Sequence, residues 1–134
     1  MHLAPHLLLR TDAAASRAGA LLSSAGYLVS RVDDDAMGER LAGSEHIDGV
    51  VVELPSLAAI HFVRKLNARY GAGGIVIVVI AAAPELLRRA VPSVLALTPF
   101  EIVDDLISAV DLAIAARQRL IAQYPRTRVA GAAG

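Results

Sequence analysis

Glu53 is the residue whose position most clearly invites chemistry, because it ends the apolar run in "IDGVVVELP" at residues 47–55. The run predicts a buried strand, since its β-branched residues follow one another without alternation and Pro55 then stops it. Ligands and reactive groups gather at the carboxyl ends of strands in α/β proteins. Glu53 is therefore either a solvated loop residue or a carboxylate held at such an edge.

Acidic residues also follow the first two predicted strands, as Asp12 and as the triplet Asp33 to Asp35. Together with Glu53 they would form an acidic rim able to bind a cation. Helix capping explains them better, because an aspartate at a helix start accepts hydrogen bonds from the unpaired amides of the first turn. We assign no metal site, since the four histidines also lack neighbouring ligands.

Catalytic and cofactor motifs are missing from the sequence. The chain has no cysteine, which excludes thiol nucleophiles, disulfides and thiolate metal sites. The glycine cluster "GAGG" at residues 71–74 precedes a predicted strand, whereas a nucleotide-binding glycine loop follows one. No serine stands in a Gly-x-Ser-x-Gly motif. We expect a protein that is not an enzyme and that needs no cofactor.

Length and charge indicate one soluble domain. With 134 residues, 55% of them hydrophobic, the chain can bury a core, and its net charge of zero attracts neither nucleic acid nor an anionic membrane. The longest apolar block, "IVIVVIAAAP", is about half of the roughly 20 residues of a membrane span. The start, "MHLAPHLLLRTD", lacks the basic segment of a signal peptide. We expect a cytoplasmic protein.

The alternation of elements predicts the fold. Strands are expected at residues 7–10, 27–32, 47–52, 75–80 and 94–97. Helices are expected between them, with starts at Asp12, Asp33 to Asp35, Ser56 and Pro84, ends at Gly26, Gly43, Gly71 and Pro92, and a last helix over residues 101–124. Continuous apolar strands imply a parallel sheet covered on both faces. The prediction is an α/β fold with a doubly wound, five-stranded parallel sheet.

This order of elements and two stretches resemble the receiver domain of two-component response regulators. The stretch "GYLVSRVDDDAMGERLAGSEHIDGVVVELP" is similar to the second strand, second helix and third strand of that family, and "LTPF" is similar to its lysine-proline-phenylalanine turn. The resemblance covers about residues 6–115. It implies the flavodoxin-like strand order 2-1-3-4-5 and a cis Thr98–Pro99 peptide bond.

In that family two acids after strand one hold Mg²⁺, an aspartate after strand three accepts a phosphoryl group, a hydroxyl residue ends strand four, and a lysine precedes the proline. The matching positions are Leu9 with Arg10, or Arg10 with Thr11, then Glu53, Ala81, Thr98 and Pro99. Mg²⁺ and an ammonium group neutralise the phosphoryl oxygens during transfer. Because these positions supply neither, the resemblance implies a degenerate receiver, or pseudo-receiver. We expect Arg10 to pair with Glu53 instead.

The role of Glu53 stays open between several interpretations. It is either a structural carboxylate neutralised by Arg10 or a fixed mimic of the phosphorylated acid, although Ala81 offers no hydroxyl to sense such a mimic. Two further alternatives are a receiver that accepts phosphate on Glu53 and a flavodoxin-like domain that binds a small molecule. We favour a phosphorylation-independent interaction module of a bacterial signalling or transcription protein, whose partner is another protein or a fused output domain.

The last predicted helix carries more apolar surface than the sheet requires. It spans roughly 36 Å at 1.5 Å per residue, and Leu120, Ile121 and Tyr124 extend its apolar face beyond the predicted core. Such a seam suits pairing with another helix, and the alternative is a frayed end. With Leu95 and Val103, these residues form the predicted interface of a homodimer. We expect a folded domain over residues 1–125 and a disordered tail over residues 126–134.

Overall fold

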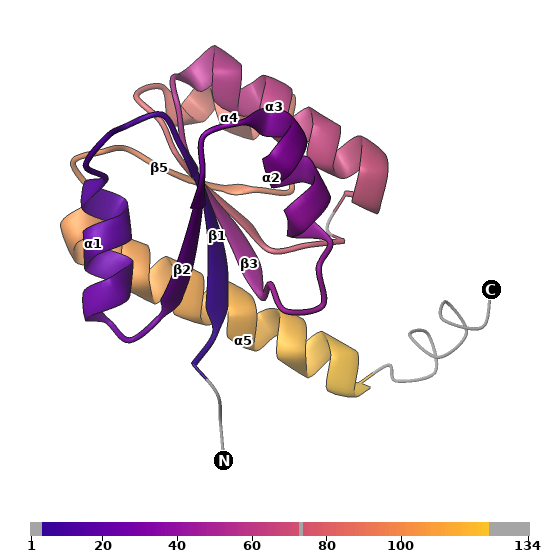
Figure 1. Cartoon of the computed structure of the whole chain (residues 1–134). Coiled ribbons are helices and arrows are strands. Elements are labelled where there is room, and N and C mark those ends of the chain that lie inside the picture. The colour runs from indigo at the N-terminus through magenta and orange to yellow at the C-terminus, as the bar shows by residue number, and fades with distance from the viewer. Residues whose placement is uncertain (1–3, 73, 124–134) are drawn as a thin grey trace.

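The computed structural model describes residues 4–72 and 74–123 (Figure 1). In this part of the chain one sheet of five parallel strands is formed, in the order β2-β1-β3-β4-β5. The strands are β1 (His6–Thr11), β2 (Leu28–Val32), β3 (Gly49–Glu53), β4 (Ile77–Ile80) and β5 (Leu95–Leu97). The predicted fold class and strand order are confirmed.

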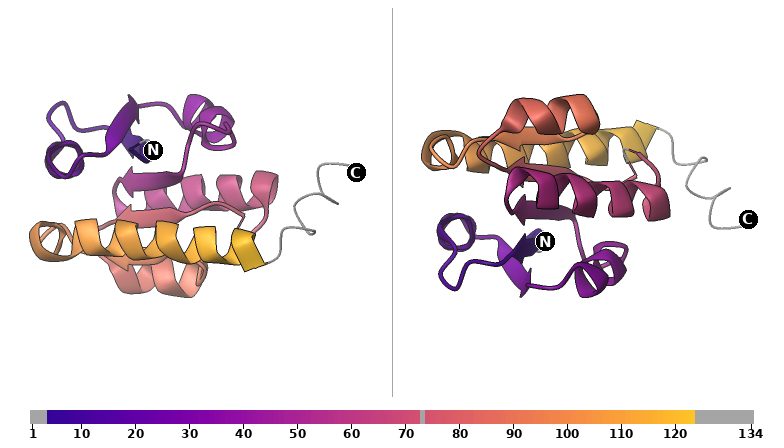
Figure 2. Two further views of the ribbon diagram at one scale, coloured as in Figure 1. Left: turned by 90° about the horizontal axis from the view of Figure 1, so that it is seen from below. Right: turned by 90° about the horizontal axis from the view of Figure 1, so that it is seen from above.

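Helices cover both faces of this sheet. They are α1 (Arg17–Ser24), α2 (Asp35–Ala42), α3 (Ser56–Tyr70), α4 (Pro84–Ala90), the π-helix η1 (Ile102–Leu106) and α5 (Ile107–Gln123). Residues of α1 and α5 enter one core cluster, and residues of α2, α3 and α4 enter the other. In Figure 2, α5 lies in front of the sheet in the view from below, whereas α3 and α4 lie in front in the view from above. No helix within the described residues is long and apolar enough to cross a membrane.

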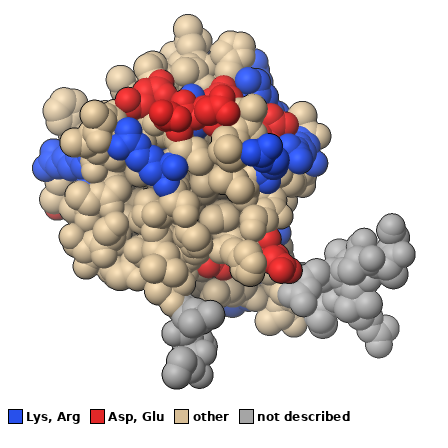
Figure 3. Space-filling view, viewed as in Figure 1, with Lys and Arg blue, Asp and Glu red and all other residues tan. Residues whose placement is uncertain are grey.

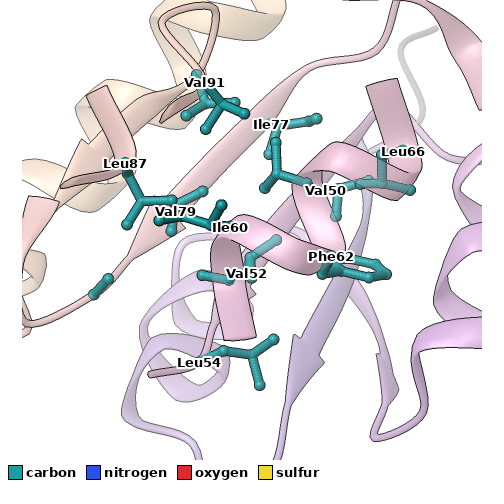
Figure 4. Packing of buried hydrophobic residues seen from close by; sticks show 14 of the residues in the cluster. Val50, Val52, Leu54, Ile60, Phe62, Leu66, Ile77, Val79, Leu87 and Val91 are labelled. Carbon is teal, nitrogen blue, oxygen red and sulfur yellow. The ribbon is translucent and has the colours of Figure 1, made fainter. Parts of the chain in front are cut away.

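The central strands β3 and β4 are apolar, apart from Glu53, because successive residues enter different cores. Val50 and Val52 of β3 belong to the cluster on the α3 face, whereas Val51 between them belongs to the cluster on the α1 and α5 face. Figure 4 shows the first cluster, where Phe62 and Leu66 of α3 lie close to the strands. Both side chains are fully buried, and each contributes about 2–3 kcal/mol through burial. The carboxyl edge of the sheet therefore rests on a rigid core.

Helix capping is confirmed for α2 and corrected for α1. Asp34 is the N-cap of α2, with its Oδ2 accepting a hydrogen bond from the Met37 amide at 3.0 Å. Asp12 does not cap α1, because the chain continues for several residues before the helix begins. Ser16 is the cap, and its Oγ accepts a hydrogen bond from the Gly19 amide at 3.0 Å.

Ser56 is not the cap of α3 as predicted. It is the first helical residue, and Pro55 occupies the cap position without a side-chain hydrogen bond. The Ser56 hydroxyl instead accepts a hydrogen bond from the Ala83 amide at 3.0 Å. The hydroxyl thus joins the β3–α3 loop to the β4–α4 loop, a contact between segments far apart in sequence.

Several boundaries differ from the predicted ones. β3 and β4 begin two residues later than expected, at Gly49 and Ile77. Before β3, the Asp48 amide donates to the His6 carbonyl oxygen, and Asp48 Oδ2 accepts a hydrogen bond from the His6 amide, both at 2.8 Å. The Thr98–Pro99 bond is trans, since the described part of the chain contains no cis peptide bond. The predicted tail lies outside the described residues.

Candidate functional site

The carboxyl ends of β1, β2 and β3 bring the predicted site residues to one edge of the sheet. Thr11, the last residue of β1, is the register partner of Glu53, the last residue of β3. Acidic side chains gather near the upper edge of the molecule in Figure 3, flanked by Lys and Arg. Within the described residues, the buried polar side chains are Arg10 and Thr11, with 8% and 0% of their surfaces exposed.

The carboxylate of Glu53 is held by two hydroxyl groups. Its Oε1 accepts hydrogen bonds from Thr11 Oγ1 and from Ser16 Oγ, both at 2.8 Å. Each hydroxyl also accepts a hydrogen bond from a backbone amide, Thr11 from Ala13 at 3.1 Å and Ser16 from Gly19 at 3.0 Å. The carboxylate therefore ties the end of β3 to the end of β1 and to the start of α1.

The guanidinium of Arg10 joins two other carboxylates at the same edge. Its Nε donates to Asp35 Oδ1 at 2.8 Å, and its Nη1 donates to Asp12 Oδ1 at 2.7 Å. Its central carbon lies 5.9 Å from the centre of the Phe62 ring, within range of a cation–π interaction. Lys65 Nζ approaches the other oxygen of Asp35 at 3.3 Å. Arg10 thus supplies a fixed positive charge that links the β1–α1 loop to the start of α2.

Pairing shifts the pKa values of both partners in this cluster. Burial alone would raise the pKa of Asp35, but the hydrogen bonds and charges of Arg10 and Lys65 outweigh burial and hold that pKa below its usual range. Burial alone would lower the pKa of Arg10, and its hydrogen bonds to Asp12 and Asp35 raise the pKa above its ordinary value. Both groups are therefore ionised at neutral pH.

The predicted ion pair between Arg10 and Glu53 is wrong. Adjacent positions on neighbouring strands point to opposite faces of a sheet, so these two side chains diverge. Arg10 lies on the α3 face, near Phe62, whereas Glu53 lies on the α1 face, beside Ser16. Hydroxyl groups, and not a guanidinium, hold the Glu53 carboxylate.

The candidate residues at the end of the first strand differ in their surroundings. Leu9 is buried in the core cluster on the α1 and α5 face, with 1% of its surface exposed. The residues that end β1 are therefore Arg10 and Thr11. No group of three or more His, Cys, Asp or Glu side chains is arranged to hold a metal ion within residues 4–72 and 74–123.

The remaining predicted positions carry no ionisable side chain. Ala81 is buried at the end of β4, and its amide donates to the Leu97 carbonyl oxygen at 2.9 Å. The Thr98 amide donates to Glu101 Oε1 at 2.7 Å, and this bond holds the pKa of Glu101 below its usual value. Pro99 is exposed. The loops after β4 and β5 thus bring no cation toward Glu53.

Sequence reasoning missed two residues that fix the β1–α1 loop. Ser16 could have been found, because a serine three residues before Gly19 has the spacing of an N-cap. Arg31 of β2 donates from its guanidinium to the carbonyl oxygens of Ala13 and Ala14. No local pattern marks Arg31, since this contact depends on how β2 lies beside β1.

A second candidate site, called the exposed apolar surface below, comprises exposed apolar side chains of α4, β5, α5 and the segment between β5 and α5. Its members have exposed fractions of 42% to 92% and are Leu86, Leu95, Phe100, Val103, Leu112 and Leu120. Three of the predicted interface residues belong to it, namely Leu95, Val103 and Leu120. Ile121 is half-buried and lines a cavity near the starts of β3 and β4. Tyr124 lies outside the described residues.

Comparison with known proteins identifies the fold. A crystal structure of a response regulator from Thermotoga maritima has a TM-score of 0.60 at 18% identity, covering 84% of this chain and 99% of that chain. A de novo designed Rossmann 2x3 fold protein, solved by solution NMR, has a TM-score of 0.58 at 12% identity, covering 81% and 90%. No protein-family model and no curated protein matches the sequence. The chain has a receiver-like fold, which many functions share.

Proposed function

We propose that this chain is a phosphorylation-independent, receiver-like module that works by binding another protein and has no enzymatic activity of its own. The observation that carries this proposal is the state of Glu53, whose Oε1 accepts hydrogen bonds from the hydroxyls of Thr11 and Ser16. A carboxylate bound in this way is a structural link between β3, β1 and α1. Both hydroxyls engage Oε1 and neither brings the positive charge that a transferring phosphoryl group needs.

The charges around Glu53 support the same proposal. Transfer of a phosphoryl group to a carboxylate relies on a divalent cation and further positive charge on the phosphoryl oxygens. Arg10, next to the end of β1, engages the carboxylates of Asp12 and Asp35, which could otherwise serve as ligands of a divalent cation. Ala81 and Thr98 add neither charge nor metal ligand at the ends of β4 and β5.

The exposed apolar surface supports a role in protein interaction. Leu95 is 45% exposed on the edge strand β5, and Phe100 is 92% exposed in the segment after it, so both large apolar side chains face solvent. Clusters of exposed apolar residues are typical of interaction sites. We propose a signalling role in which a second copy, another protein or a fused output domain binds this surface.

Treatment with a phosphate donor tests the proposal. The full chain is incubated with Mg²⁺ and acetyl phosphate, and separately with beryllofluoride, and is then analysed by intact-mass spectrometry and thermal unfolding. We expect no phosphoryl adduct and no change in melting temperature, for the chain and for the control Glu53→Gln alike. An adduct that is present on the natural chain and lost in Glu53→Gln would instead establish a receiver that uses Glu53 as its acceptor.

A further inference from the structure

The outer face of α5 has an uncharged middle, whereas a helix that only covers a sheet is expected to carry polar and charged residues on its outer face. Positions that recur at intervals of three and four residues on this face are all exposed, and they are Ser108, Leu112, Ala115, Arg119 and Ala122. Leu112 is 67% exposed. From Leu112 to Gln118 the exposed residues are uncharged, including the adjacent alanines 115 and 116, and Arg117 is only partly exposed. The exposed centre of the face thus carries no charge, and its middle consists of alanines.

Charges on this face are separated along the helix. Asp104, Asp105 and Asp111 are exposed toward the start of η1 and α5, whereas Arg119 is exposed toward the end. Two copies of the face laid side by side in parallel would bring acid to acid and Arg119 to Arg119. In the antiparallel arrangement the acidic half of one copy meets the basic half of the other, and the uncharged centres meet in the middle.

We propose that two copies of this chain associate through the outer faces of α5 as an antiparallel pair around a two-fold axis at Ala115. The axis places Asp111 of each copy opposite Arg119 of the other, Leu112 opposite Gln118, and Ser108 opposite Ala122. The same patch serves both copies, as a closed two-fold dimer requires. The proposal rests on the proposed function, because it names a second copy as the protein that covers part of the exposed apolar surface.

The size of the face sets the strength of this association. From Ile102 to Gln123 the helical segment is about 33 Å long at 1.5 Å per residue. A helix face of this length supplies less than the roughly 800 Å² per partner of a standard stable interface. The dimer is therefore expected to be weak and to appear as a concentration-dependent equilibrium between monomer and dimer.

Charge exchange at Asp111 and Arg119 tests the orientation. We measure sedimentation equilibrium of the full chain up to about 1 mM, a concentration at which a dimer with a dissociation constant below that value is mostly formed. Asp111→Arg alone and Arg119→Asp alone are each expected to weaken dimerisation by at least about tenfold, because each creates two like-charge contacts. The double variant, and an equal mixture of the two single variants, restore both opposite-charge contacts and dimerise again. Arg64→Asp, on α3 across the sheet, is the matched control and dimerises like the natural chain.

Cross-linking gives a second readout that does not depend on charge. The chain contains no cysteine, so a single one can be introduced without interference. With a short bismaleimide, Ala115→Cys is expected to cross-link to itself, because it lies on the axis, whereas Ser108→Cys is not. Circular dichroism confirms that each variant is folded. A chain that stays monomeric, or equal cross-linking at both positions, overturns the antiparallel pair while leaving the phosphate-donor result unaffected.

Discussion

Thr11 and Glu53 end neighbouring strands as register partners, and the Thr11 hydroxyl donates to the Glu53 carboxylate at 2.8 Å. Thr11 is fully buried, so its hydroxyl has no access to water and depends on this bond. The two residues therefore stabilise each other, and the carboxyl edge of the sheet is held by an internal network. This explains how a carboxylate can end an otherwise apolar strand, because the hydroxyls of Thr11 and Ser16 provide its hydrogen bonds.

Replacing Thr11 by valine tests this network. Thr11→Val keeps the shape of the side chain but removes a donor to Glu53 and leaves the Ala13 amide without its acceptor. We expect the free energy of unfolding to fall by about 1–3 kcal/mol, measured by urea denaturation. Ser23→Ala, which removes an exposed hydroxyl on α1, should change it by less than about 0.5 kcal/mol. Equal effects of the two substitutions would contradict a structural role for Thr11.

Acid should weaken the link between Arg10 and Asp35. The pKa of Asp35 lies below the roughly 3.9 of an unfolded aspartate, because Arg10 and Lys65 outweigh the effect of burial. Between those two values the unfolded state binds more protons, so stability rises with pH. The contribution is full above about pH 4 and is lost as the pH falls through the pKa of the folded state.

Asp35→Asn should remove this pH dependence. We expect the free energy of unfolding, measured from pH 2 to pH 6, to depend less on pH below about pH 4 in this variant than in the natural chain. Asp34→Asn is the control, since asparagine also caps a helix and the Arg10 contacts are untouched. A steep acid transition that persists in Asp35→Asn would assign the effect to other carboxylates.

Sequence patterns predicted the elements of this fold well, because the signals for those elements are local. The uninterrupted apolar residues of β3, the aspartate that caps α2 and the proline that starts α4 all act within a few residues of their own position. The site required more. Arg10 and Thr11 are adjacent, yet they point to opposite faces of the sheet, so a shift of one residue exchanges the partner of Glu53.

The last helix was harder to predict for a different reason. A regular helix places Val103 on the same face as Leu106, yet Val103 is 50% exposed and Ile102 is buried. The π-helical turn η1 has more residues per turn than an α-helix. The residues at its start, such as Val103, therefore point in another direction than a continuous α-helix would give them. Ile121, expected on the outer seam, is half-buried near the sheet.

Gly43 permits the close approach of α2 and α3. A Cβ atom at this position would overlap the Tyr70 ring, whose hydroxyl donates to the Glu39 carbonyl oxygen at 2.5 Å. We expect Gly43→Ala to destabilise the fold by about 1–3 kcal/mol, measured by denaturation. If the overlap is the cause, Gly43→Ala combined with Tyr70→Leu will cost less than the two single substitutions added together. Additive costs would place the effect in the α2 backbone.

Two neighbouring leucines of α4 differ in exposure, because one faces solvent and the other lies in the core. Leu86 is 42% exposed and belongs to the exposed apolar surface, whereas Leu87 is fully buried. We expect Leu87→Ala to lower the free energy of unfolding by about 2–5 kcal/mol and Leu86→Ala by less than about 1 kcal/mol.

Phe100→Ser, at a residue that is 92% exposed, should leave stability within about 0.5 kcal/mol and lower the fluorescence of a bound apolar dye. Because Leu86 and Phe100 then add little to folding, a strong loss of stability in either variant would show that they pack within the domain and are not available to a partner.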